Sequence, residues 1–199
     1  MKKRKGASIP KALRQQSTSY SSPSVIRRAR EFPLEDCWIS SSWRDDSPGL
    51  VQIIVARQQP DGNICFGAYL VDKLCLGLKN TFARANLTPA RYEAGITTFF
   101  QELEPQECPP ELAYQMIYDS IDYAAQFGFE PQKDFELSQY MLPPRGEFKA
   151  LYKLKFGKNG KPFFIAGPHD NAEAIVAQLE KTAGPGNYDT LIMVPPDMF

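Results

Sequence analysis

Residues 50–82 carry the strongest structural signal in the chain, because two apolar runs flank a short polar turn there. The first run is LVQIIVARQQ, the second is ICFGAYLVDKLCLGLKNTF, and PDGN joins them. Asp and Gly tolerate the backbone angles of a tight reversal, so the pattern predicts a β-hairpin. The second run stays apolar for longer than a half-exposed strand requires. We therefore expect both of its faces to be buried at the centre of the core.

Helical signals follow the hairpin. Thr88 can cap a helix and Pro89 suits its first position, which predicts a helix over 89–103. A second helix is predicted over 109–127, with an apolar stripe on one side and polar residues on the other, and Gly128 ends it. The polar side is expected to contain Glu111, Gln115, Asp119, Asp122 and Gln126. A further short helix is predicted over 134–141.

The C-terminal residues predict a ββαβ unit over about 148–195. FKALYKLKFG and PFFIAG are expected to be two strands joined by a type I′ turn at Asn159 and Gly160. Asp170 and Glu173 resemble a capping box for the next helix, and YDTLIMV is the final strand. The order of elements predicts an α+β fold with a central β-hairpin, two to three helices and this ββαβ unit. With 199 residues, of which 43% are hydrophobic, we expect one compact domain over 32–199.

The formal net charge of zero conceals a strong asymmetry. Nine of the 23 basic residues lie in the first thirty positions, which contain no acid, so the remainder has 14 basic against 23 acidic residues. Residues 1–31 are also rich in serine and lack periodicity, which predicts a disordered arm on an acidic body. Such an arm is suited to nucleic-acid phosphates, although a solubilising tail is the alternative. The predicted nucleic-acid-binding residues are Lys2, Lys3, Arg4, Lys5, Lys11, Arg14, Arg27, Arg28 and Arg30.

Cysteine and histidine usage argues against common metal and cofactor sites. The four cysteines form no CxxC pair and His169 is the only histidine, so we expect no structural zinc. The motifs of common nucleotide-binding enzymes, zinc proteases and α/β-hydrolases are not found, and we predict no cofactor. Cysteines within apolar runs suggest reduced thiols in a cytoplasmic protein. The apolar runs are interrupted by charge, so no membrane span is predicted.

Asp72 is the least expected charged residue, because it interrupts an apolar run. A buried carboxylate needs a partner, and Lys73 and Lys79 could each supply an ion pair. The alternative is that Asp72 joins Asp119 and Asp122 in a metal-binding cluster of the kind nucleases use.

Two other residues have both a catalytic and a structural interpretation. His169 precedes a predicted helix and could act as a general base beside Asp170, or it could simply occupy a turn. Cys75 could be a nucleophile or a buried thiol, and nothing in its neighbours stabilises a thiolate.

Two segments, YLVDKLCLGLKNTF at 69–82 and IYDSIDYAAQFGFEPQKDF at 117–135, resemble a group of uncharacterised bacterial proteins. The stretch KFGKNGKPFFIAGPHD fits the same pattern, so the resemblance covers most of residues 35–194 and excludes the basic arm. It implies a bacterial cytosolic protein and carries over no activity.

Three functions are consistent with these observations. The leading hypothesis is a non-enzymatic bacterial protein whose basic arm contacts nucleic acid, RNA in a ribonucleoprotein above all. The first alternative is a metal-dependent hydrolase or nuclease that uses Asp72 with Asp119 and Asp122, or His169. The second is a protein-interaction module in which the acidic body docks a protein partner and the arm is a solubilising tail.

Overall fold

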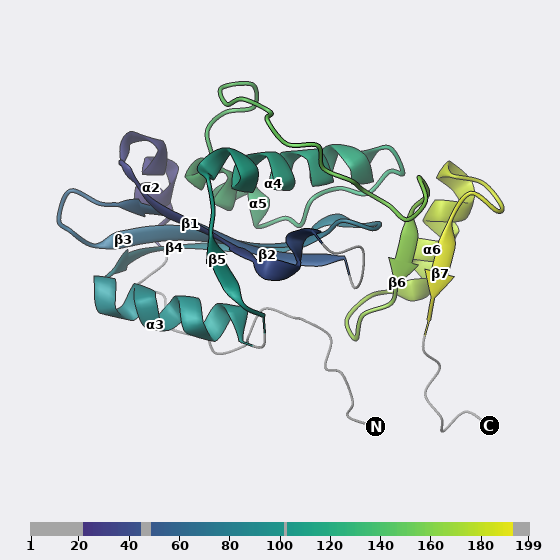
Figure 1. Cartoon of the computed structure of the whole chain (residues 1–199), viewed down its shortest axis with the longest axis horizontal. Coiled ribbons are helices and arrows are strands. Elements are labelled where there is room, and N and C mark those ends of the chain that lie inside the picture. The colour runs from purple at the N-terminus through teal and green to yellow at the C-terminus, as the bar shows by residue number, and fades with distance from the viewer. Residues whose placement is uncertain (1–21, 45–48, 102, 193–199) are drawn as a thin grey trace.

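The computed structural model describes residues 22–44, 49–101 and 103–192. Its centre is an antiparallel five-stranded sheet with the strand order β4-β3-β2-β1-β5. The strands are β1 (Leu34–Ser40), β2 (Leu50–Gln58), β3 (Ile64–Asp72), β4 (Gly77–Leu87) and β5 (Pro105–Glu107). The fold is α+β, as the order of elements predicted (Figure 1).

The predicted hairpin is confirmed as β2 and β3, which pair in continuous register from Leu50 opposite Asp72 to Gln58 opposite Ile64. At the turn between them, Asp61 accepts a hydrogen bond from the backbone N–H of Asn63, and Gly62 has a positive φ. All nine residues of β3 are buried, which confirms that both faces of this strand lie in the core.

The long second apolar run contains a reversal that the sequence did not reveal. Residues 73–76 form a turn, and the chain returns as β4 alongside β3. Gly77 makes the reversal possible because its φ is +64° and a Cβ there would lie 2.5 Å from the carbonyl oxygen of Ser120. The turn is therefore pressed against the helix that contains Ser120.

Helices cover both faces of the sheet (Figure 1). One face packs against α4 (Pro110–Ala125), and the other packs against α3 (Pro89–Phe100). The fully buried side chain of Tyr69 faces the α4 side and donates a hydrogen bond to the carbonyl oxygen of Ser138. That acceptor belongs to a short helical stretch made of α5 (Phe135–Ser138) and η3 (Gln139–Met141), as predicted for 134–141.

Both of the main predicted helices are present, but the prediction for the polar side of α4 is wrong at one residue. Gln115 was expected on a solvent-facing side, but it is buried, because it forms hydrogen bonds to the backbone of Tyr152. Gly128 has a positive φ and follows the end of α4, as a C-terminal glycine should.

The folded body begins before residue 32. Helix α2 (Pro23–Arg27) and η1 (Ala29–Glu31) place Ile26 and Ala29 fully inside the α4-side core. The last ten residues of the predicted arm, 22–31, therefore belong to the packed structure. Residues 1–21 lie outside the described ranges.

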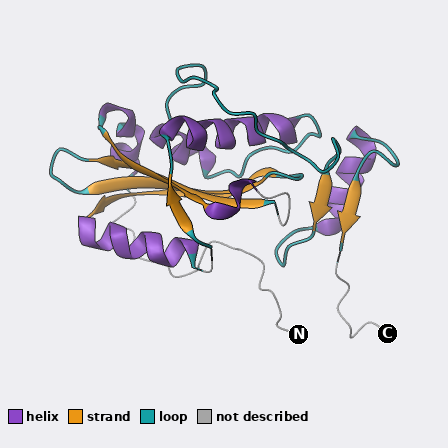
Figure 2. Cartoon of the chain, viewed as in Figure 1, coloured by secondary structure: helices purple, strands orange, loops and turns teal. Residues whose placement is uncertain are grey.

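The C-terminal unit has one strand fewer than predicted. Strands β6 (Phe163–Ile165) and β7 (Asp189–Leu191) pair in parallel, and α6 (Ala172–Thr182) connects them as a βαβ unit (Figure 2). The expected strand over FKALYKLKFG is wrong: residues 148–156 form neither helix nor strand and instead cross over α4. The turn at Asn159 and Gly160 is present, with positive φ at both positions. No helix in the described ranges is long and apolar enough to span a bilayer.

Candidate functional site

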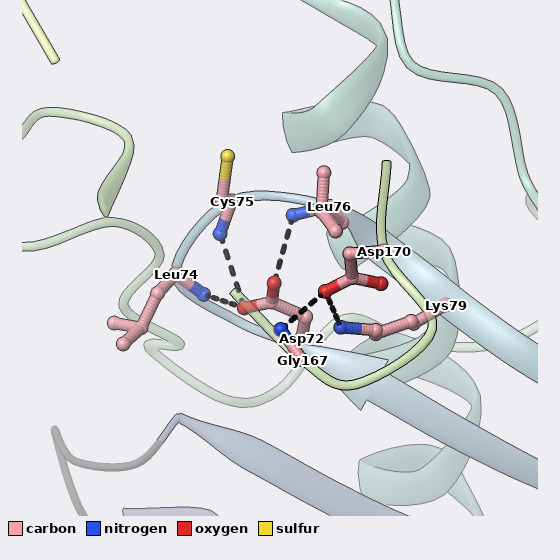
Figure 3. A network of polar contacts seen from close by, with 7 residues as sticks. All are labelled: Asp72, Leu74, Cys75, Leu76, Lys79, Gly167 and Asp170. Carbon is pink, nitrogen blue, oxygen red and sulfur yellow. Dashed lines mark hydrogen bonds and ion pairs between the residues drawn. The ribbon is translucent and has the colours of Figure 1, made fainter. Parts of the chain in front are cut away.

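Asp72, the unexpected charge, stabilises the turn that follows it (Figure 3). Its Oδ1 accepts hydrogen bonds from the backbone N–H groups of Leu74 at 2.8 Å and Cys75 at 3.2 Å. Its Oδ2 accepts one from Leu76 at 3.2 Å. Burial raises the pKa of Asp72, and these donors, together with the charge of Lys79, act against that shift. A carboxylate engaged by three backbone donors is a structural cap for the reversal.

A second carboxylate joins the C-terminal unit to the sheet (Figure 3). Oδ2 of Asp170 lies 2.5 Å from Nζ of Lys79 on β4, and it also accepts a hydrogen bond from the N–H of Gly167 at 2.7 Å. The sequence assigned Asp170 to the cap of α6, but Asn171 caps that helix through the N–H of Ala174. Asp170 therefore forms an ion pair between the C-terminal unit and the sheet.

We expect Lys79→Met to loosen the C-terminal unit, because it leaves Asp170 largely buried without its cation. The cost should be about 1 to 3 kcal/mol, below that of a fully buried pair because both side chains retain some exposure. Hydrogen exchange at Gly167 and Phe164, compared with β2, measures the local opening. The matched control is Arg145→Met, which removes an exposed pair with Asp122 and should cost less than about 1 kcal/mol. Equal protection of Gly167 in the variant and the parent would contradict this role.

The three carboxylates of the hydrolase alternative are engaged separately. Asp72 caps its turn, Asp119 accepts a hydrogen bond from Gln115, and Asp122 pairs with Arg145 at 2.6 Å. Within the described ranges, no group of three or more His, Cys, Asp or Glu side chains is arranged to hold a metal ion. The geometry therefore gives the predicted carboxylate cluster no support.

His169 and Cys75 fit their structural interpretations. His169 is exposed in the turn before Asp170 and forms no hydrogen bond within the described part of the chain. Cys75 is fully buried beside Phe164, and burial followed by the charge of Asp72 raises the pKa of its thiol. A raised pKa disfavours the thiolate that a nucleophile requires.

Of the nine predicted nucleic-acid-binding residues, the structure describes three. Arg28 pairs with Glu31 at 2.7 Å, and Arg30 donates to the carbonyl oxygens of Leu142 and Gln139. Arg27 is exposed at the end of α2. The other six lie outside the described residues: Lys2, Lys3, Arg4, Lys5, Lys11 and Arg14.

A basic surface that was not predicted from the sequence lies on residues 148–161, which we call the lysine strap. The strap contains five lysines and no acid, and all five lysines are exposed: Lys149, Lys153, Lys155, Lys158 and Lys161. Apolar residues between them pack against the α4-side core: Phe148, Tyr152, Leu154 and Phe156. The alternation of lysines and apolar residues predicts a strand, and the absence of acidic residues is the signal in the sequence that marks a basic surface.

Specific contacts hold the strap against α4. The ring of Phe148 stacks on Tyr118 with centroids 5.7 Å apart, and Phe156 stacks on Tyr123 at 5.6 Å. The buried Gln115 both donates to and accepts from the backbone of Tyr152, at 2.7 and 3.0 Å. These anchors fix the backbone, so the lysines project from an ordered support.

Comparison with known proteins gives no relative: no family model, no curated protein and no solved structure matches this chain.

Proposed function

We propose that this chain is a non-enzymatic, cytoplasmic bacterial protein that binds the phosphate backbone of nucleic acid, RNA in a ribonucleoprotein above all. The observation that carries the proposal is the lysine strap, a run of fourteen residues with five exposed lysines and no carboxylate. The six basic residues before position 22, which lie outside the described ranges, add further positive charge to the chain. Four free, buried cysteines agree with a reducing compartment.

The strap favours a backbone ligand over a small molecule. In an extended chain, side chains at alternate positions project to the same side and repeat about every 6.6 Å. Lys149, Lys153 and Lys155 occupy positions of the same parity and are all exposed, whereas Tyr152, Leu154 and Phe156 pack against the α4-side core. Within the described ranges, none of the three ammonium groups has a carboxylate partner. Phosphates along a strand can therefore replace water and counterions at these lysines.

The structure also defines how the arm should be removed. Truncation through residue 31 would delete Ile26 and Ala29 from the core, so a loss of binding could reflect unfolding. Truncation through residue 21 removes six basic residues and keeps α2 intact. We expect this shorter truncation to weaken RNA binding and its salt dependence while leaving the melting temperature unchanged.

The strap itself is tested with the double variant Lys149→Gln/Lys153→Gln in the full chain. Binding of a labelled single-stranded RNA is measured by anisotropy between about 50 and 200 mM salt. We expect roughly threefold to tenfold weaker binding and a log–log salt slope that is less steep by about 1.4, because each phosphate contact contributes about 0.7.

The matched control is Lys133→Gln/Lys181→Gln, which removes two exposed lysines elsewhere on the body. It should leave both the affinity and the slope unchanged. Equal losses of RNA affinity in the two double variants would show that only overall charge matters. The strap would then not be the binding site. No salt-dependent binding by the parent chain to RNA or single-stranded DNA would overturn the proposed function.

A further inference from the structure

A pocket of about 310 Å³ opens beside the middle of the lysine strap. This volume is at the low end of the range for small-ligand sites. Three segments that are distant in the sequence meet there with α4: η2 (Ser41–Arg44), the turn at 73–76 and the strap. The lining residues are Trp43, Arg44, Lys73, Met116, Lys153, Leu154 and Lys155.

The lining is strongly cationic, with four basic side chains and no carboxylate among the described residues. The guanidinium of Arg44 stacks over the ring of Trp43 at 4.1 Å, which limits its orientations at the rim. The buried Lys73 donates a hydrogen bond from Nζ to the carbonyl oxygen of Trp43 at 2.7 Å, so it supports η2. The cations available to a ligand are Arg44, Lys153 and Lys155.

We propose that this pocket binds a terminal phosphate group of a nucleic-acid strand. The inference rests on the proposed function and adds a preference for strand ends. A phosphomonoester carries about −1.5 to −2 charges at pH 7, whereas an internal phosphodiester carries about −1. Arg44 and Lys155 come from different segments and converge on one concave site, which suits a compact dianion better than a passing backbone. Charge-assisted hydrogen bonds from a guanidinium and ammonium groups are the strong interactions for such an oxyanion.

The test uses the full chain and one single-stranded RNA in two forms, with a 5′-phosphate or with a 5′-hydroxyl. We expect about tenfold tighter binding of the phosphorylated form, equivalent to about 1.4 kcal/mol. The variant Arg44→Gln/Lys155→Gln should lose this preference, and Lys133→Gln/Lys181→Gln should retain it. All substituted residues are exposed, and a melting curve checks that each variant is folded.

Failure of this inference is distinguishable from failure of the proposed function. Equal, salt-dependent binding of both RNA forms by the parent chain would overturn the terminal-phosphate assignment and leave the proposed function intact. If the parent chain binds neither RNA, the proposed function fails. Adenosine monophosphate and inorganic phosphate are then titrated while the indole N–H resonance of Trp43 is followed. A saturable shift that is lost in Arg44→Gln/Lys155→Gln would retain the pocket as a site for free phosphate compounds, and no shift would overturn it.

Discussion

Replacing Gly77 with alanine is expected to destabilise the protein by about 3 to 5 kcal/mol. Two effects add at this position. An L-residue at φ +64° occupies the unfavourable left-handed region, and its Cβ would lie 2.5 Å from the Ser120 carbonyl oxygen and 2.7 Å from Cβ of Ala124. These short contacts are relieved only if the β3–β4 turn moves away from α4. Equilibrium urea denaturation measures the change in the free energy of unfolding.

Gly160→Ala separates the two effects. Gly160 has a similar φ of +77°, but a Cβ there would meet no atom within 4 Å. We expect it to cost only the backbone penalty of about 1 to 2 kcal/mol. If both variants lost the same stability, the close approach of the turn to α4 would not contribute.

Asp72→Ala is the second large effect, at about 3 to 5 kcal/mol. The substitution leaves the backbone N–H groups of Leu74, Cys75 and Leu76 without their acceptor, and two of these three hydrogen bonds are buried. Burial of an unsatisfied donor costs more than a typical hydrogen bond contributes. Thermal and urea denaturation should both show the loss.

Two further variants test whether the loss of stability comes from the lost hydrogen-bond acceptor. Asp61→Ala removes an equivalent but exposed carboxylate contact at the β2–β3 turn and should cost about 1 kcal/mol or less. Asp72→Asn keeps one acceptor oxygen and should fall between the parent and Asp72→Ala. A fully stable Asp72→Ala variant would contradict the capping role of this carboxylate.

Local signals predicted the elements whose physical cause lies within a few residues. The Pro-Asp-Gly-Asn turn predicted the β2–β3 hairpin because a tight reversal depends on the angles of its own residues. Gly128 marked the end of α4 for the same reason, through its positive φ.

Elements that depend on distant partners were not predictable in this way. The strap has the alternation of a half-exposed strand, but its backbone partner is the side chain of Gln115, 37 positions away from Tyr152. The same contact explains why Gln115, on the predicted polar side of α4, is buried. Neither residue identifies the other in a single sequence.

The same distinction applies to the candidate site. The cluster of basic residues near the N-terminus was visible in the sequence, because its members are close together along the chain. The pocket needs Arg44 to lie near Lys155, and that proximity depends on the sheet and on α4, whose Met116 also lines the pocket. The carboxylates were recognisable as unusual, yet their roles depend on Lys79 and on backbone donors within a turn that had not been predicted.

Hydrogen bonds from η1 and β2 to the end of η3 have a consequence for synthesis on the ribosome. Arg30 donates to the carbonyl of Leu142, 112 positions later, and the buried Arg57 donates to Met141 as well as to Phe32. At about 5 to 20 residues per second, the 112 positions from Arg30 to Leu142 take roughly 6 to 20 s to synthesise. During that interval the α4-side core is incomplete, because α4 and η3 follow strands β1 to β4 in the chain. The basic N-terminal segment is therefore synthesised well before the body can close around its core.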